Sequence, residues 1–283
     1  MRAKSLAAGA ALVVGLGVLA GCSTSIAGSP AASGSSGGSG GQGGAGSQLG
    51  SQVHTVSDLS NLVGSSVEQA TTVQVNMKNA VGTTTGSIKF GDPVAEKMTL
   101  NTASGTEQVL LVNNVFYVQI PGLSDITNKP WIKIDPNDTS NPASQIFAAL
   151  VNSIKENADP STMIKNLEAG GTLTGTDTEQ LGGQTTTHYK ITVDVNKMIA
   201  NQTDPTMKQM LTLAQQQGLT NYPVEVWLDS HGLPVQTTIT MPALSGAPGS
   251  GGPDTTTYSN WGAPVSISAP PDDQVGTMPG TGG

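Results

Sequence analysis

Hydrophobic residues follow two different periods along the central part of the chain. Between Val56 and Val67 they recur every three or four positions, which predicts an amphipathic helix with Ser57 or Asp58 as its cap. From Val73 onward apolar and polar residues alternate, as in strands that bury one face. A helix is therefore expected to precede a series of antiparallel strands.

The alternating segments are short and are separated by turn residues such as Asn113-Asn114 and Gly182-Gly183. This spacing favours a meander in which successive strands pair with each other. The expected strands are residues 73–78, 87–90, 97–102, 108–112, 115–120, 172–179, 185–194, 222–229, 234–241 and 255–261.

Three further helices are indicated by an Asn or Asp followed by proline, the order of a cap and a first helical position. They begin at Asn141-Pro142, Asp159-Pro160 and Asp204-Pro205. The first carries an apolar stripe that includes Phe147, Leu150 and Ile154. About ten strands with three or four helices predict an α+β fold.

The bulky residues also set the limits of the folded part. Every Phe, Tyr and Trp lies between Phe90 and Trp261, and the apolar pattern begins near Val53, so we expect one folded domain over residues 53–268. Residues 22–52 are rich in Gly, Ser and Ala, a composition typical of a disordered tether. Residues 269–283 are expected to form a disordered tail.

Residues 1–21 have the pattern of a lipoprotein signal peptide. Arg2 and Lys4 precede an apolar stretch that ends in Leu19-Ala20-Gly21-Cys22, the form of a bacterial lipobox. We expect cleavage before Cys22, with an S-diacylglycerol group and an N-acyl chain such as palmitate on that cysteine. Cys22 is the only cysteine, so no disulfide competes for it. The expected location is the extracytoplasmic face of the cell membrane, held by a lipid anchor.

Charge and chemistry exclude several classes of function. The net charge is −8, and loss of a leader carrying Arg2 and Lys4 would take it to about −10, which disfavours nucleic acid as a partner. We expect no catalytic residues, because Asp229-Ser230-His231 is a turn sequence and His188 falls on the presumed solvent face of its strand. No metal-ligand spacing is present, so neither a metal nor a cofactor is expected.

Several short motifs resemble a known group of proteins. Two motifs follow the lipobox and the tether along the chain. The first is Val226-Trp227-Leu228-Asp229 with Gly232-Leu233-Pro234, and the second is Tyr258-Ser259-Asn260-Trp261-Gly262-Ala263-Pro264-Val265. This order resembles the LppX/LprA/LprF/LprG lipoproteins of mycobacteria and other actinobacteria. The resemblance implies a LolA/LolB-like fold, a curved antiparallel half-barrel whose concave face is covered by helices over an apolar cavity.

The resemblance further implies that the protein binds acylated lipids or glycolipids and carries or presents them in the cell envelope. An envelope transporter is a candidate partner, and we expect a monomer. The alternative is a non-catalytic envelope scaffold without a lipid cavity. The candidate lining residues, each of which could equally belong to an ordinary core, are Val73, Val75, Met77, Val109, Leu111, Phe147, Leu150, Ile154, Ile191, Val193, Val226 and Ile239.

Overall fold

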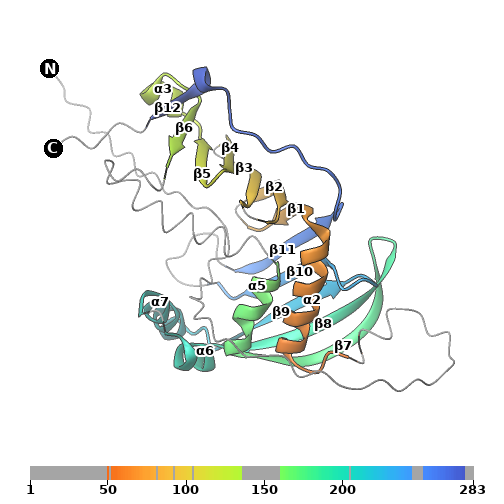
Figure 1. The fold of residues 1–283 in the computed structure, drawn as a ribbon. Helices are drawn as coiled ribbons and strands as arrows, with labels where there is room; N and C mark the ends of the chain where they lie inside the picture. Colours follow the sequence, from red (N-terminus) through yellow and green to blue (C-terminus); the bar gives the residue numbers. More distant parts are fainter. Residues whose placement is uncertain are drawn as a thin grey trace.

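The computed structural model describes residues 50–135, 160–243 and 251–277, apart from positions 51, 81, 92, 104 and 204. Helices and strands combine in an α+β fold built on one open, curved sheet (Figure 1). Twelve strands form it in the order β12-β6-β5-β4-β3-β2-β1-β11-β10-β9-β8-β7. The antiparallel α+β architecture expected from the sequence is confirmed, with twelve strands in place of about ten.

The first six strands form a continuous antiparallel meander. Alternation predicts the first five of them, and the sixth is an addition that the structure shows. Asn113 and Asn114 form the turn between β4 and β5, both with positive φ, a conformation that asparagine tolerates. The strands are β1 (Thr72–Lys78), β2 (Gly82–Lys89), β3 (Ala95–Thr102), β4 (Gly105–Val112), β5 (Val115–Gln119) and β6 (Trp131–Ile134).

The second group of strands joins the first where β11 pairs with β1. Gly182 and Gly183, with φ of 61° and 83°, make the tight turn between the two longest strands, β7 and β8. This group consists of β7 (Gly171–Leu181), β8 (Gln184–Asp194), β9 (Asn221–Leu228), β10 (Pro234–Met241) and β11 (Gly252–Ser259).

One strand falls inside the segment that the sequence assigns to a disordered tail. After the short η2 helix (Asp272–Gln274), β12 (Val275–Thr277) pairs in parallel with β6. Ordered structure therefore continues to residue 277. Three residues beside a proline-rich stretch are too few to show alternation, and their partner strand lies more than 130 residues earlier.

Helix α2 (Val56–Ala70) opens the domain, as its apolar spacing predicts. Its N-cap is Thr55 rather than Ser57 or Asp58. Thr55 Oγ1 accepts from the Asp58 backbone N–H at 3.1 Å, and Asp58 Oδ2 accepts from the Thr55 N–H at 2.9 Å. The His54 N–H donates to the same carboxylate oxygen at 3.0 Å, and this hydrogen bond, with those that Thr55 makes to the carboxylate, lowers the pKa of Asp58.

The other described helices are α3 (Leu123–Thr127), α5 (Pro160–Asn166) with the 3-10 turn η1 (Leu167–Ala169), α6 (Val195–Asn201) and α7 (Pro205–Gln216). The helices that begin at Pro160 and Pro205 agree with the sequence, whereas the helix expected after Asn141 lies outside the described residues. In the part of the chain that the structure describes, no helix is both long and apolar enough to cross a membrane.

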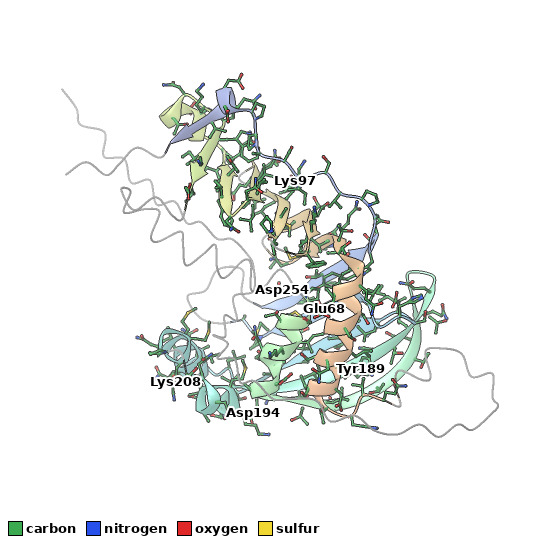
Figure 2. The ribbon with its side chains drawn as sticks, viewed as in Figure 1. Glu68, Lys97, Tyr189, Asp194, Lys208 and Asp254 are labelled. Atoms are coloured by element: carbon green, nitrogen blue, oxygen red, sulfur yellow. The ribbon has the colours of Figure 1, made fainter. Side chains whose placement is uncertain are left out.

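The largest hydrophobic core lies between α2, α5, α6 and α7 and the strands β8 and β9. Leu59, Val63 and Val67 of α2 are fully buried there, and Tyr189 lies beneath the helix (Figure 2). Residues three or four apart on α2 face this core, which is the reason for the spacing seen in the sequence.

Candidate functional site

The described lining candidates of the strands all lie on one face of the sheet, which we call the inner face. Directly opposite residues of antiparallel strands share a face, so the strand register connects them. The connecting pairs include Val73 with Ile88, Ile88 with Glu96, Glu96 with Leu111, Met77 with Thr256, Thr256 with Thr237, Thr237 with Val226, and Ile239 with Val224.

Part of the inner face belongs to the main core. Ile191, Val193 and Val226 are at most 1% exposed and pack in the cluster formed with α2, α5, α6 and α7. Ile239 lies at the margin of the same cluster. Three of these candidates thus belong to the core that the helices share with β8 and β9, and Ile239 borders it.

The other part of the inner face belongs to β1–β6 and carries two smaller apolar clusters. One contains Leu111 with partly buried Val109, together with Phe116, Val118, Ile132 and Ile134. The other contains Val73 and Val75 with Ile88, Met98, Phe90, Tyr258 and Trp261. Met77 lies beyond Val75 on the same face and is half-buried. The candidates Phe147, Leu150 and Ile154 lie outside the described residues.

Glu96 interrupts the apolar surface between these two clusters. Its cross-strand neighbours are Ile88 and Leu111, and its same-face neighbours on the chain are Val94 and Met98. The residue is only 5% exposed, and Glu96 Oε2 has no hydrogen-bond partner among the described residues. Burial raises the pKa of this carboxyl from 4.5 to about 7.

Sequence reasoning missed Glu96, although its position carried a signal. In the strand after Pro93, side chains alternate between the two faces of the sheet. Glu96 lies on the same face as Met98 and Leu100, whereas Lys97 lies on the other face and is exposed (Figure 2 labels Lys97). A carboxylate in the buried phase of an apolar strand is rare unless it has a partner or a function.

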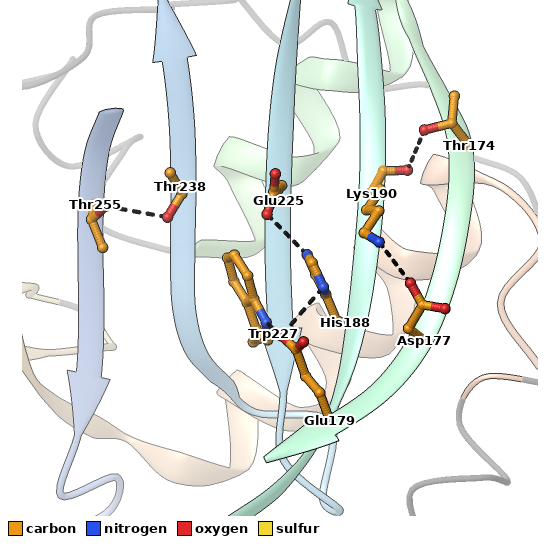
Figure 3. Close-up of polar contacts among 9 residues, drawn as sticks. All are labelled: Thr174, Asp177, Glu179, His188, Lys190, Glu225, Trp227, Thr238 and Thr255. Carbon is orange, nitrogen blue, oxygen red and sulfur yellow. Dashed lines mark hydrogen bonds and ion pairs between the residues drawn. The ribbon is translucent and has the colours of Figure 1, made fainter. Parts of the chain in front are cut away.

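A second group of polar side chains lies on the opposite face of β7, β8 and β9 (Figure 3). The His188 ring stacks on Trp227 with centroids 4.1 Å apart. Its Nε2 is 3.1 Å from Glu225 Oε2 and its Nδ1 is 3.3 Å from Glu179 Oε1. Trp227 Nε1 also donates to Glu179. The four residues form a closed network across three strands.

The network corrects the expectation that His188 is solvated. His188 does lie on the face opposite Tyr189, but it is only 5% exposed because the Trp227 ring covers it. Alternation gives the face of a residue and not what lies above that face. Beside it, Lys190 donates to Asp177 Oδ2 at 2.7 Å, which lowers the pKa of Asp177 and raises that of Lys190.

The Asp229-Ser230-His231 segment forms the turn between β9 and β10. Asp229 Oδ1 accepts from the backbone N–H groups of His231 at 2.8 Å and Leu233 at 2.9 Å, an Asx-type turn. Ser66 of α2 donates to the His231 carbonyl at 2.8 Å. The Asp229 carboxylate is therefore occupied in holding the turn, as the sequence indicates.

Burial also raises the pKa of three other groups on the inner face, the Tyr189, Tyr222 and Asp254 side chains. Burial raises the pKa of the Tyr189 hydroxyl to about 12, and this hydroxyl has no hydrogen-bond partner in the described chain. Burial also raises the pKa of Asp254, which is opposite Ile239. Among the described residues, no group of three or more His, Cys, Asp or Glu side chains is arranged to hold a metal ion.

No protein-family model matches this sequence, and no curated protein matches it either. Among solved structures, the lipoprotein LppX of Mycobacterium tuberculosis is similar over 75% of this chain and 98% of its own, at 14% identity and a TM-score of 0.45. LprF of Mycobacterium bovis is similar over 77% of this chain and 99% of its own, at 14% identity and a TM-score of 0.43. The MucA/MucB complex of Pseudomonas aeruginosa is similar over 77% of this chain and 60% of its own, at 14% identity and a TM-score of 0.33. LppX and LprF are two of the lipoproteins that the sequence motifs resemble.

Proposed function

We propose that this protein is a non-catalytic envelope lipoprotein that binds acylated lipids or glycolipids on the inner face of β1–β6 and carries or presents them in the cell envelope. The observation that carries the proposal is the apolar surface of these strands. Two clusters of aliphatic and aromatic side chains continue across neighbouring strands of the curved sheet. An acyl chain would bury its methylene groups against such a surface at about 0.8 kcal/mol per CH₂.

The distribution of the described helices supports the same location. Helices α2, α5, α6 and α7 pack in the core with β8 and β9, and α3 lies beside β6. The apolar residues of β3, β4 and β5 on the inner face belong to the smaller clusters. The predicted stripe of Phe147, Leu150 and Ile154 would provide a cover for a ligand at this place.

The proposal includes a lipid anchor on Cys22, which lies outside the described residues. A diacylglyceryl group with an added acyl chain would hold the protein at the membrane, because two or more chains bind firmly where one binds weakly. A tether of about 30 residues would let the domain move roughly 30 Å from the bilayer. Labelling of cells with a palmitate analogue should mark the natural chain and not a Cys22→Ser variant.

Native mass spectrometry of the Cys22→Ser chain after incubation with envelope lipid extract tests lipid binding. We expect a stoichiometric lipid adduct that is released by organic solvent. Val109→Trp and Val118→Trp place an indole on the inner face of β4 and β5 and should abolish the adduct. Thr99→Trp adds the same ring on the opposite face of β3 and should leave it intact.

A protein that stays free of lipid under these conditions would contradict the lipid-carrier proposal. The function would then be that of the alternative, an envelope scaffold without a lipid cavity. Equal loss of the adduct in Thr99→Trp and Val109→Trp, with all variants folded, would place the ligand elsewhere than on the inner face.

A further inference from the structure

Glu96 is a polar group in a place that otherwise suits only hydrocarbon. The four nearest positions on the inner face are Ile88, Leu111, Val94 and Met98, all apolar. In the part of the chain that the structure describes, Glu96 Oε2 has no donor within hydrogen-bond distance. A buried carboxyl without a partner costs free energy, typically 1–3 kcal/mol or more, and nothing in the described fold offsets it.

The position of Glu96 relates it to the surface proposed to bind lipid. One apolar cluster extends from it toward β4, β5 and β6, and the other toward β2 and β1. A ligand lying along this surface would place hydrocarbon on both sides of Glu96 and some atom of its own over the carboxyl. If that atom were a carbon, the carboxyl would lose contact with any water and remain unpaired.

We propose that Glu96 hydrogen-bonds a hydroxyl group of the bound lipid, so that the preferred ligand is an acyl lipid with a free hydroxyl between its apolar arms, as in a 1,3-diacylglycerol. This inference rests on the proposed lipid-binding function. A neutral hydroxyl fits better than an ammonium group, because no second acidic side chain lies among the immediate neighbours of Glu96 and a cation would lose more hydration on entering an apolar surface.

The protonation of Glu96 is consistent with a neutral partner. Burial raises its pKa to about 7, so near neutral pH the group is a mixture of acid and carboxylate. A hydroxyl can donate to the carboxylate and can both donate to and accept from the acid. The same contact therefore forms in either state.

Competition between two matched lipids tests the inference. The Cys22→Ser full chain is incubated with an equimolar mixture of 1,3-dipalmitoylglycerol and its 2-O-methyl ether, and the two complexes are separated by native mass spectrometry. We expect the free hydroxyl to be preferred by about tenfold or more, the effect of one buried hydrogen bond. Glu96→Met should bind both lipids equally, and Glu96→Gln, whose amide oxygen still accepts, should retain a preference.

Glu107→Met is the matched control, because Glu107 lies on the same face in β4, opposite Leu100, but is partly exposed. It should keep the preference of the unchanged chain. Thermal unfolding of each variant confirms that it is folded. Equal binding of the two lipids by the unchanged chain, or a preference that survives in Glu96→Met, would overturn the inference while leaving lipid binding intact. Absence of both dipalmitoylglycerol adducts, while envelope lipid extract still gives an adduct, would overturn this inference alone. Absence of an adduct from both sources would overturn both proposals.

Discussion

At the scale of single residues, Glu96 makes stability depend on pH. Its pKa is about 7 in the folded protein and near 4.5 when exposed, so the folded state binds the proton more tightly. The contribution of Glu96 to stability is therefore fully present below pH 4.5 and is lost as pH rises through 7, a decrease of about 3 kcal/mol from this group. Glu96→Gln, which has no proton to lose, should lack this decrease.

Urea unfolding at pH 4.5, 6 and 8 measures the effect as a difference between the two proteins. Because other carboxyl groups titrate in both, only the difference in pH dependence reports on Glu96. Parallel curves for the unchanged chain and Glu96→Gln would mean that the carboxyl is solvated in the folded protein. The same result would remove the structural basis for its proposed contact with lipid.

His188 gives a second prediction at this scale. Its ring is stacked on Trp227 and contacts two carboxylates, so His188→Ala should leave a gap under the indole and lose both polar contacts. We expect a loss of about 2–3 kcal/mol in the free energy of unfolding. His231→Ala is the control, since that side chain is 80% exposed and should change stability by less than about 0.5 kcal/mol. Similar effects of the two substitutions in urea unfolding would refute a structural role for the His188 network.

At the scale of elements, β12 protects the edge of the sheet. It pairs in parallel with β6, and Lys129 Nζ donates to the Asp273 carbonyl nearby. Removal of residues 272–283 should expose the backbone groups of β6 and the Trp131 side chain, which is 9% exposed. We expect a loss of about 1–2 kcal/mol and an increased tendency to aggregate. Thermal unfolding and light scattering check this, with removal of residues 278–283 alone as the control.

The elements that sequence could predict are those with a local cause. Helix α2 follows from apolar spacing, and the β4–β5 and β7–β8 turns follow from Asn113-Asn114 and Gly182-Gly183. The pairing of β1 with β11 and of β12 with β6 joins residues far apart in the chain, and no local pattern encodes it. Helix α6 was missed because seven residues directly after a long strand give too few turns for a period.

For the candidate site, the sequence predicted the face on which each strand residue lies, and the lining role of these residues stays a prediction. Alternation placed the described strand candidates on one face, which the register shows. It could not separate Ile191 and Val226, which pack under helices, from Val109 and Leu111, which belong to the smaller cluster. That division depends on where the helices dock, and docking is a property of the whole molecule.

At the scale of the whole molecule, the sheet has two parts of unequal packing, joined by the β1–β11 pairing. The helices and β8–β9 share the large core, whereas β2–β6 depend on two small clusters. Local opening is easiest where few apolar contacts would be broken. We therefore expect backbone amides of β4, β5 and β6 to exchange with deuterium faster than those of β8 and β9.

A ligand on the inner face should reduce this difference in exchange rate between the two parts of the sheet. The ligand would bind β2–β6 only when these strands are paired and not locally opened. It should therefore slow the hydrogen exchange of their backbone amides and leave exchange in β8 and β9 nearly unchanged. Hydrogen exchange of the Cys22→Ser chain with and without dipalmitoylglycerol measures this, and Val109→Trp should remove the protection. Slower exchange in β8 and β9 alone would instead locate the ligand in the helical core. Such a site would require Ile191 and Val226, now packed against helices, to separate from them.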